Sequence, residues 1–211
     1  MKKPFDFNHS TALIIGGGSG IGKEIALALC EHGANVVIAG RNEEKLALTS
    51  AEINKTVEGQ CSYVVVDVTS EISVEGLILS VDAKFDGKLN ILVNSAGTNI
   101  RAPIKDVTLV DFQEVVSTNL TGTFLATKAA QYLLQAAEFG RVINLASIFS
   151  TVSYPDRLSY ASSKAGVLLF SKTIALEWAL YGITVNTISP GPLLTEINKK
   201  VLNDKVNYDK F

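Results

Sequence analysis

The sequence predicts an α/β fold in which helices cover both faces of one doubly wound parallel sheet. Short runs rich in Val, Ile and Leu alternate with longer segments whose apolar residues recur at helical spacing. Each run is almost continuously apolar, as expected for a strand that is covered on both faces. Because strands and helices alternate along the chain, successive strands should run parallel.

The predicted elements follow one another without a long linker or an internal repeat. Strands are predicted in the segments TALIIG, NVVIAG, CSYVVV, LNILVN, GRVINLAS and ITVNTIS, which begin at Thr11, Asn35, Cys61, Leu89, Gly140 and Ile183. Helices are predicted to begin near Ile21, Glu43, Ser70, Leu109 and Ser159, most of them after a small polar or glycine-containing turn. The polar segment from Thr195 has a helical start, and no further predicted strand follows it.

The length and composition indicate a single domain over residues 1–211 with a sizeable core, since 47% of the residues are apolar. The formal net charge is only −2, so no broad basic field is expected to hold nucleic acid or an anionic membrane. The longest apolar region begins at Val167 and is interrupted by Lys172 and Glu177, which argues against a membrane-spanning helix.

The cysteines and histidines do not have the spacing of metal ligands. Cys30 and Cys61 are expected to be buried free thiols rather than a disulfide or a metal site, and His9 and His32 are isolated in the sequence. We therefore predict no bound metal. The start of the chain lacks an apolar stretch of signal-peptide length, and a reducing cytoplasm is the expected location.

A glycine-rich turn joins the first strand to its helix in the segment IGGGSGIGKE. Glycines there let the backbone turn sharply and approach a pyrophosphate, whose charge meets the free amides of the helix N-terminus. The spacing G-x-x-x-G-x-G therefore predicts a dinucleotide site of the Rossmann type. The expected contacts in this turn are Gly16, Gly18, Ser19, Gly20, Ile21 and Gly22.

Two other interpretations of this turn are weaker. Residues 17–23 also match the P-loop pattern G-x-x-x-x-G-K, but Glu24 follows where a P-loop needs a Ser or Thr hydroxyl for magnesium. A carboxylate at that place would repel phosphate. A glycine turn without any ligand is the remaining alternative, although tight strand-to-helix turns rarely need so many glycines.

The end of the second strand favours NADP(H) over NAD(H), although NAD(H) remains possible. An acidic residue there would hold the adenosine ribose hydroxyls of NAD, but the chain has Gly40 followed by Arg41, whose guanidinium suits a 2′-phosphate. Asp67 and Val68, after the third strand, are predicted to contact the adenine. The alternatives are a solvated loop arginine at position 41 and a helix-capping Asp67.

The fourth and fifth strands end in residues suited to carbonyl chemistry. Asn94, Ala96 and Gly97 let a backbone pass close to a flat ring, and the fifth strand leads to Ser147. Tyr160 and Lys164 then lie four residues apart, on one face of a predicted helix. This spacing alone is a weak signal, since about 0.4 such pairs are expected by chance in a chain of this composition.

With these motifs together, the chain resembles the short-chain dehydrogenase/reductase family in its single-domain form, from Thr11 to about Asn198. The resemblance rests on the ordered segments GGGSGIG, NSAG, VSTNLTGTF, YASSK and PGPLLT, together with Ser147. Two residues depart from the family pattern: Ile15 replaces a threonine before the glycine turn, and Ser95 replaces the second asparagine of N-N-A-G. Both departures concern structural positions.

The resemblance implies a catalytic group consisting of Ser147, Tyr160, Lys164 and Asn119. Tyr160 would give a proton to, or take it from, the substrate oxygen, and Ser147 would stabilise the charge that develops there. An ammonium about 5 Å away, at an effective dielectric constant of roughly 20, is expected to lower the phenol pKa by ~2 units. Lys164 would supply that charge and bind the nicotinamide ribose, and Asn119 would connect it to solvent through a water.

The resemblance also implies further cofactor and substrate contacts. The predicted cofactor contacts after the sixth strand are Pro190, Gly191, Leu193 and Thr195, and Tyr160 and Lys164 should also contact the cofactor. The predicted walls of the substrate pocket are Ser147, Arg101, Phe149, Tyr154, Arg157 and Leu194, with Glu196 as a further candidate. The segments NSAGTNIRAP and PGPLLTEIN resemble the corresponding segments of gluconate dehydrogenases and 3-oxoacyl reductases. Arg101 and Arg157 would suit an anionic carbonyl or alcohol substrate.

Two functions are therefore compared. The first is an NADP(H)-dependent oxidoreductase of ketones and secondary alcohols, and the second is a non-catalytic dinucleotide-binding or redox-sensing protein. The second rests on the expectation that the substrate lid, which begins at about residue 192, is truncated and that the usual seventh strand is absent. The wide apolar stripe of the helix after Tyr160 predicts a homodimer or homotetramer.

Overall fold

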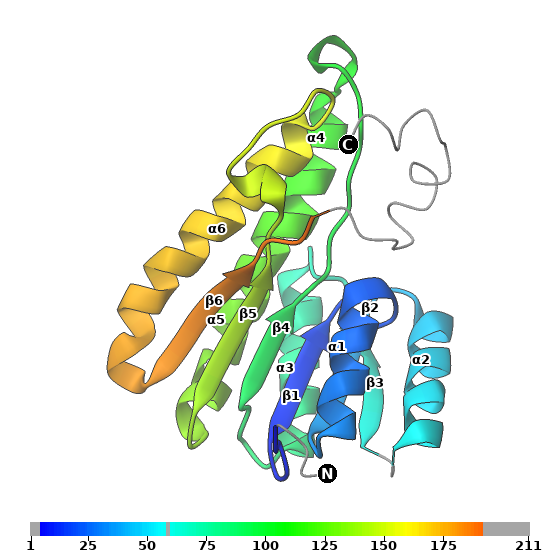
Figure 1. Cartoon of the computed structure of the whole chain (residues 1–211), viewed down its shortest axis with the longest axis vertical. Coiled ribbons are helices and arrows are strands. Elements are labelled where there is room, and N and C mark those ends of the chain that lie inside the picture. Colours follow the sequence, from blue (N-terminus) through cyan, green and yellow to red (C-terminus); the bar gives the residue numbers. More distant parts are fainter. Residues whose placement is uncertain (1–4, 58–59, 192–211) are drawn as a thin grey trace.

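The computed structural model describes residues 5–57 and 60–191, and it contains a six-stranded, fully parallel sheet with the order β3-β2-β1-β4-β5-β6 (Figure 1). The strands are β1 (Thr11–Ile15), β2 (Asn35–Gly40), β3 (Cys61–Val65), β4 (Ile91–Asn94), β5 (Gly140–Leu145) and β6 (Ile183–Ile188). The prediction of a doubly wound parallel sheet is confirmed, because helices pack on both faces of the sheet. The expectation that each strand is covered on both faces is met by the central strands, whereas the edge strands β3 and β6 expose alternate residues.

Five of the six helices in the described residues begin within one residue of the predicted positions, and the helix that begins at Gly122 was not predicted separately. They are α1 (Gly20–Glu31), α2 (Glu43–Thr56), α3 (Glu71–Lys84), α4 (Leu109–Val116), α5 (Gly122–Ala136) and α6 (Leu158–Trp178). Side chains of Asn42, Ser70 and Thr108 cap α2, α3 and α4 by accepting a backbone N–H of the first turn. Short 3₁₀ turns lie at η1 (Ile104–Asp106), η3 (Ile148–Ser150) and η4 (Ala179–Tyr181).

The helix predicted to begin near Leu109 is followed by a π-helical turn, η2 (Ser117–Thr121), which separates α4 from α5. The wider turn carries Thr118 and Asn119 into the interior, where both are buried. Periodicity alone did not predict this interruption, because one turn of i→i+5 bonding leaves the apolar pattern on either side intact.

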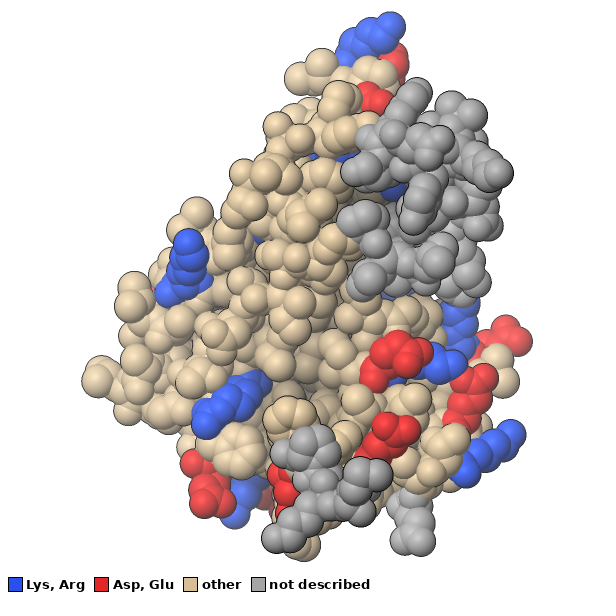
Figure 2. Space-filling view, viewed as in Figure 1, with Lys and Arg blue, Asp and Glu red and all other residues tan. Residues whose placement is uncertain are grey.

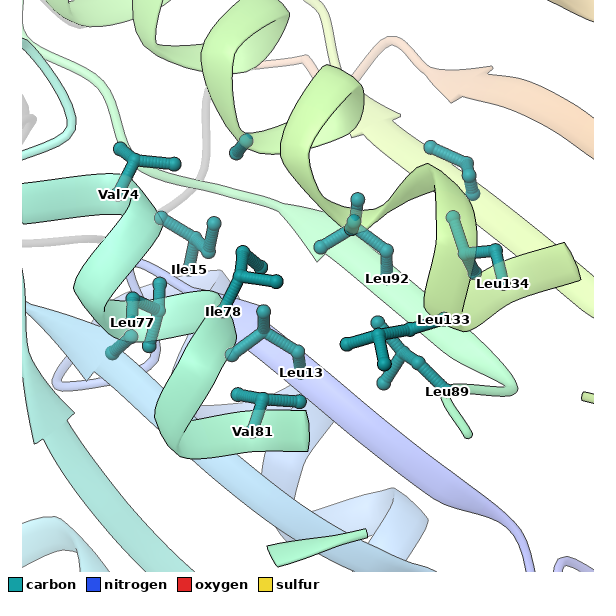
Figure 3. Close-up of a cluster of buried hydrophobic side chains, with 14 of the residues drawn as sticks. Leu13, Ile15, Val74, Leu77, Ile78, Val81, Leu89, Leu92, Leu133 and Leu134 are labelled. Carbon is teal, nitrogen blue, oxygen red and sulfur yellow. The ribbon is translucent and has the colours of Figure 1, made fainter. Parts of the chain in front are cut away.

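Two apolar layers cover the sheet. Side chains of α1 and α2 pack on one face, and those of α3, α5 and α6 pack on the other. Figure 3 shows the second layer, where Leu77 and Val81 of α3 and Leu133 of α5 pack against Leu13 of β1 and Leu92 of β4. All five are fully or almost fully buried, so the central strands are held rigidly from this side.

The strand order sets the place of the functional site. The chain proceeds from β1 to β3 in one direction and then returns to β4, which pairs with the opposite edge of β1. Connections after β1 and β4 therefore leave the sheet in opposite directions and open a crevice at the carboxyl ends of these strands. The glycine turn and the NSAG segment both lie at that crevice.

A buried polar chain links the two central strands to the helices behind them. The Asn94 side chain donates to Thr127 Oγ1 at 3.1 Å and to Asn144 Oδ1 at 2.8 Å, and Asn144 donates to Ser171 Oγ at 2.8 Å. These residues come from β4, α5, β5 and α6. Because buried amides are stable only when they are hydrogen-bonded, this chain fixes the relative positions of the four elements.

Charged side chains of both signs are dispersed over the face in Figure 2, where the described residues form no large patch of one sign. No helix in the described part of the chain is long and apolar enough to cross a membrane. Residues 5–57 and 60–191 also contain no group of three or more His, Cys, Asp or Glu side chains that could hold a metal ion.

Candidate active site

The glycine turn brings the ends of β1 and β4 into direct contact. Gly16 has φ +82°, and a Cβ atom on it would lie 2.5 Å from the backbone nitrogen of Ala96. A Cβ atom on Gly22 would lie 2.3 Å from the carbonyl oxygen of Gly16. Only glycine fits at either position, because the opposing atoms belong to the backbone and cannot rotate away.

The N-terminus of α1 is prepared for an anion. Ser19 caps the helix in an extended conformation, and within the described chain its side chain makes no capping hydrogen bond. The first turn contains no acidic residue, so its amides and the helix dipole face the crevice without a competing negative charge. The glycine turn is also held by α2, because the Gly18 carbonyl oxygen accepts a 3.0 Å hydrogen bond from Thr49 Oγ1 of that helix.

The shape of this crevice fits a dinucleotide. The crevice at the strand switch point has a close backbone turn and an open helix N-terminus, and Gly20 (φ +55°) completes the turn. This is the set of groups that holds a pyrophosphate in doubly wound folds. The residues of the turn therefore fit a nicotinamide dinucleotide.

Arg41 and Asp67 lie near each other at the ends of β2 and β3. Arg41 is exposed, and its charge helps to lower the pKa of Asp67, although hydrogen bonds from the Thr69 backbone and side chain are the larger causes. Asp67 Oδ1 accepts from Thr69 N at 2.9 Å and from Thr69 Oγ1 at 2.7 Å. Asp67 is thus a turn residue, and the helix-capping alternative is wrong because Ser70 caps α3.

The NSAG segment contributes backbone rather than side chains to the crevice. The Asn94 amide nitrogen is bonded within the polar chain of the core, and its buried Oδ1 has no hydrogen-bond partner among the described residues. The predicted contact of Asn94 with the cofactor stays a prediction. Ala96 lies against Gly16, and a Cβ atom on Gly97 would lie 3.2 Å from Asn119 Oδ1 and 3.6 Å from Lys164 Nζ. Gly97 therefore leaves room beside the predicted catalytic residues.

Ser147, Tyr160 and Lys164 are brought together as predicted. The Ser147 hydroxyl makes a side-chain hydrogen bond with Tyr160, and Lys164 Nζ lies 5.8 Å from the centre of the Tyr160 ring. Ser147 is held at the end of β5, since its Oγ accepts from Phe149 N and its backbone N–H donates to Ser150 Oγ, both at 3.2 Å. The cluster joins β5 and η3 to the first turns of α6.

Lys164 is almost fully buried behind this cluster. Its exposed fraction is 5%, and Nζ donates a hydrogen bond to the Leu145 carbonyl oxygen at 2.5 Å. Burial lowers the pKa of Lys164 to about 8, because the ammonium loses hydration. The group can therefore carry a positive charge near neutral pH at a fixed position.

The pKa of Tyr160 differs from our expectation. We expected Lys164 to lower it, whereas the pKa is raised, and burial of the phenol is the largest cause. The hydrogen bond with Ser147 and the positive charge of Arg157 act in the opposite direction. The prediction of a lowered value is wrong for this structure, because it counted a nearby charge and left out the desolvation of a half-buried ring.

Asn119 is completely buried in the π-helical turn. Its Oδ1 accepts from Thr98 N at 2.8 Å, and its Nδ2 donates to Thr98 O at 3.0 Å and to Ser163 Oγ at 2.9 Å. These bonds tie the loop after β4 to α6. Asn119 therefore positions the cluster, and the water-mediated path to Lys164 stays a prediction.

Two residues of this framework were missed by sequence reasoning. Ser150 donates to the Lys164 carbonyl oxygen at 3.0 Å, and Ser163 donates to the Tyr160 carbonyl oxygen at 2.7 Å. Ser150 had a signal, because it lies three residues after Ser147 at the spacing of a capping box. Ser163 had none, since its partner Asn119 is distant in the sequence.

The predicted substrate residues form an aromatic and cationic cluster around Phe149. Its ring centre lies 6.4 Å from those of Tyr154 and Tyr160, and the Arg157 guanidinium lies 5.5 Å above it. Arg157 is 4% exposed, and its pKa is lowered by burial and by the charge of Arg101, which places both guanidinium groups in one region.

The predicted contacts after β6 are covered only in part. Pro190 accepts a 3.2 Å hydrogen bond from Ile148 N, which holds the chain beside Ser147, and Gly191 follows it on the surface. The other predicted contacts in this segment lie outside the described residues: Leu193, Leu194, Thr195 and Glu196.

A doubly wound sheet with a dinucleotide turn and a Ser-Tyr-Lys cluster at its switch point defines a class of protein, the nicotinamide-dependent oxidoreductases. The family model described as short chain dehydrogenase matches residues 10–206, and the chain belongs to this family. Its named relatives are dehydrogenases and reductases, and the chain is an oxidoreductase that acts on CH–OH groups.

Three relatives illustrate the similarity. The D-threitol dehydrogenase of Mycolicibacterium smegmatis is 37% identical over 198 residues, which cover 93% of this chain and 75% of that protein. The glucose 1-dehydrogenase of Gluconobacter oxydans is 34% identical over 203 residues, covering 96% and 76%. The crystal structure of a gluconate 5-dehydrogenase from Burkholderia cenocepacia in complex with NADP and tartrate has a TM-score of 0.91 at 33% identity, covering 97% and 80%.

Proposed function

We propose that this oxidoreductase uses NADP(H) and transfers a hydride between nicotinamide and a ketone or secondary alcohol, with Tyr160 as the proton donor and acceptor. The observation that carries the proposal is the hydrogen bond between Tyr160 and Ser147 in front of the buried Lys164 ammonium. The non-catalytic alternative is not favoured, because the relatives are named as dehydrogenases and a cofactor sensor needs no proton donor.

Ser147, Tyr160 and Lys164 have different roles in the proposed reaction. Nicotinamide, when bound, supplies or accepts the hydride. Ser147 donates a hydrogen bond to the substrate oxygen, and the Tyr160 hydroxyl gives its proton to the alkoxide that forms there. Lys164 would stabilise the phenolate that remains after proton transfer, since its buried ammonium is held 5.8 Å from the ring centre. In the oxidation direction the same proton returns to Tyr160.

Arg41 is the basis for proposing NADP(H). Replacing Arg41 by Ala should raise the KM for NADPH by about 10- to 100-fold, because hydrogen bonds to a charged phosphate contribute about 1.5–3 kcal/mol. The KM for NADH should change by less than about twofold, since NADH has no 2′-phosphate. Steady-state kinetics with both cofactors measure the two effects.

Arg141 provides the control for the loss of one arginine. It lies in β5, at the opposite end of the strands from the crevice, where Nη1 donates to the Gly140 carbonyl oxygen at 2.8 Å. Arg141→Ala should leave both KM values unchanged. A wild-type preference for NADH, or equal effects of Arg41→Ala on both cofactors, would show that the assignment of the 2′-phosphate is wrong.

The substrate we propose is a hydroxylated, anionic carbonyl compound such as a keto sugar acid. The support is the region around Phe149, where Arg101 and Arg157 lie with their guanidinium groups near the Ser147–Tyr160 pair. A buried guanidinium beside a second one favours an anion between or beside them. A structural relative of this chain was crystallised with tartrate, a dicarboxylate.

Arg101→Ala should separate charge recognition from catalysis. Because Arg101 is only partly buried, its replacement should preserve the fold while raising the KM for a 5-keto sugar acid about tenfold. The KM for the corresponding neutral keto sugar alcohol should stay within about twofold. If Arg101→Ala and Arg157→Ala both leave the KM of every anionic ketone unchanged, the substrate is not recognised by its charge here.

We also propose that the chain forms a homodimer through α5 and α6. Leu169 and Leu176 of α6 and Leu180 of η4 are 63%, 81% and 93% exposed, and the exposed Phe124 of α5 packs edge-to-face on Phe170 of α6. Exposed apolar side chains of this size are typical of an interface.

Sedimentation velocity should give a dimer or a larger species for the wild-type protein, and Leu176→Glu should yield monomers. A monomeric wild-type protein would contradict the proposal.

A further inference from the structure

The two cysteines of the chain meet in the core on the α1 and α2 side of the sheet. Cys30 lies in the last turn of α1, and Cys61 is the first residue of β3. Both are free and buried, with exposed fractions of 3% and 6%, and their side chains make a hydrogen bond with each other. They belong to one apolar cluster with Val36 and Ile53. The fold thus places two thiols in contact that the sequence separates.

The two thiols are not equivalent. The pKa of Cys61 is lowered, first by the hydrogen bond from Cys30 and also by the charge of Lys84, while burial acts in the opposite direction. The pKa of Cys30 is raised by the same hydrogen bond and by burial. Of the two thiols, Cys61 is the one that lines a cavity together with the cationic Lys84, and it is therefore the one expected to ionise and react first.

Cys61 is also held firmly in place. Its carbonyl oxygen accepts from Ser50 Oγ at 2.9 Å and from Asn54 Nδ2 at 2.8 Å, and its backbone N–H donates to Asn54 Oδ1 at 2.9 Å. These bonds fix the start of β3 on α2. The backbone of Cys61 is therefore held at a fixed position against α2.

A cavity large enough for a small molecule borders Cys61. Cys61 lines a cavity of about 230 Å³ at the amino ends of β2 and β3, together with Asn35, Gln60, Ser62, Lys84 and Phe85. A water molecule occupies about 30 Å³ in the liquid, so a molecule of the size of hydrogen peroxide fits. The cationic Lys84 side chain in the wall favours a thiolate.

We propose that Cys30 and Cys61 are a reversible oxidation site that closes to an intrachain disulfide when the protein meets a hydroperoxide. The Cys61 thiolate attacks one peroxide oxygen, the O–O bond breaks, and the leaving hydroxide takes up the proton that Cys61 released, so that water leaves and a sulfenic acid forms. The Cys30 sulfur then attacks the Cys61 sulfur, the S–O bond breaks, and the hydroxide leaves as water with the Cys30 proton. Two electrons pass from the two sulfurs to the peroxide.

The wild-type chain tests the proposal directly. It is exposed to hydrogen peroxide, quenched, unfolded in acid and alkylated with N-ethylmaleimide, and its mass is measured before and after reduction by dithiothreitol. We expect a mass lower by two hydrogen atoms with no added alkyl group, a proteolytic peptide that joins Cys30 to Cys61, and two alkylated thiols after reduction. Two alkylated thiols without reduction, a bridge only between separate chains, or sulfinic acid in place of the bridge would each overturn it.

Single variants test the order of the two steps, with circular dichroism to confirm that each is folded. In Cys30→Ala the Cys61 sulfenic acid should persist and be trapped by dimedone. In Cys61→Ala the Cys30 thiol should remain alkylatable after the same exposure. Dimedone labelling of Cys30 but not of Cys61 in these variants would reverse the assignment and contradict the proposal. The wild-type measurement does not depend on either variant.

Discussion

Replacing Tyr160 by Phe is expected to lower kcat for carbonyl reduction by about 10²- to 10⁴-fold, the range that general acid catalysis contributes. The change removes only the hydroxyl group. The ring should keep its edge-to-face contact with Phe149, whose centre lies 6.4 Å away, so the fold and the cofactor crevice are preserved. The affinity for NADPH should therefore stay within about twofold, since the phenol contributes a minor part of the cofactor contacts. Stopped-flow turnover and NADPH fluorescence titration separate the two quantities.

Tyr63→Phe is the matched control, because Tyr63 lies in the edge strand β3 with a side chain that is 38% exposed and distant from the Ser147 cluster. It should have wild-type kcat. If Tyr160→Phe retained wild-type turnover on every ketone that the enzyme reduces, the phenol could not be the proton donor, and the proposed function would have to be abandoned.

Replacing Gly22 by Ala is expected to disrupt the cofactor turn. The new Cβ atom would lie 2.3 Å from the Gly16 carbonyl oxygen and 3.2 Å from Gly17 Cα. These are backbone atoms, so the start of α1 must move away from β1, and such overpacking costs typically 1–3 kcal/mol. We expect the Kd for NADPH to rise by about 10- to 100-fold, because each 1.4 kcal/mol is a factor of ten. Calorimetric titration measures the Kd.

Gly76→Ala provides the control for this substitution. Gly76 lies within α3, and a Cβ atom there would meet nothing within 4 Å among the described residues. Since alanine favours helix by about 1 kcal/mol over glycine, this variant should bind NADPH normally and unfold at a slightly higher temperature. A Gly22→Ala protein that binds NADPH as tightly as the wild type would contradict the geometry of the turn.

The parts of the fold that could be predicted from the sequence depend on residues that are neighbours in the chain. The apolar runs that became strands and the polar caps Asn42, Ser70 and Thr108 define their elements by neighbouring residues alone. The five predicted helix starts therefore agree with the structure within one residue, although no helix ends were predicted and the start of α5 was missed. The spacing of Tyr160 and Lys164 likewise puts both on one face of α6. The π-helical turn at Asn119 is the exception, because its bonding pattern leaves no trace in the apolar periodicity.

The electrostatic part of the site was less predictable. The direction of the Tyr160 pKa depends on how completely the ring is removed from water, and that depends on η3 and the first turns of α6. The inward orientation of Asn94 depends on Thr127 and Asn144, which come from a helix and a strand that follow it in the chain. Neither neighbour can be identified from the residues that flank Asn94.

The sequence by itself determined the parallel α/β sheet and the glycine turn, and it indicated Ser147, Tyr160 and Lys164 as a candidate group, because each depends on short-range pattern and residue type. Only the tertiary structure decided what surrounds these groups. It showed that burial raises the pKa of Tyr160, that Asp67 is a turn residue, and that Cys30 and Cys61 share one hydrogen bond. The physical reason is that desolvation and contact are properties of packing between elements that lie far apart in the chain.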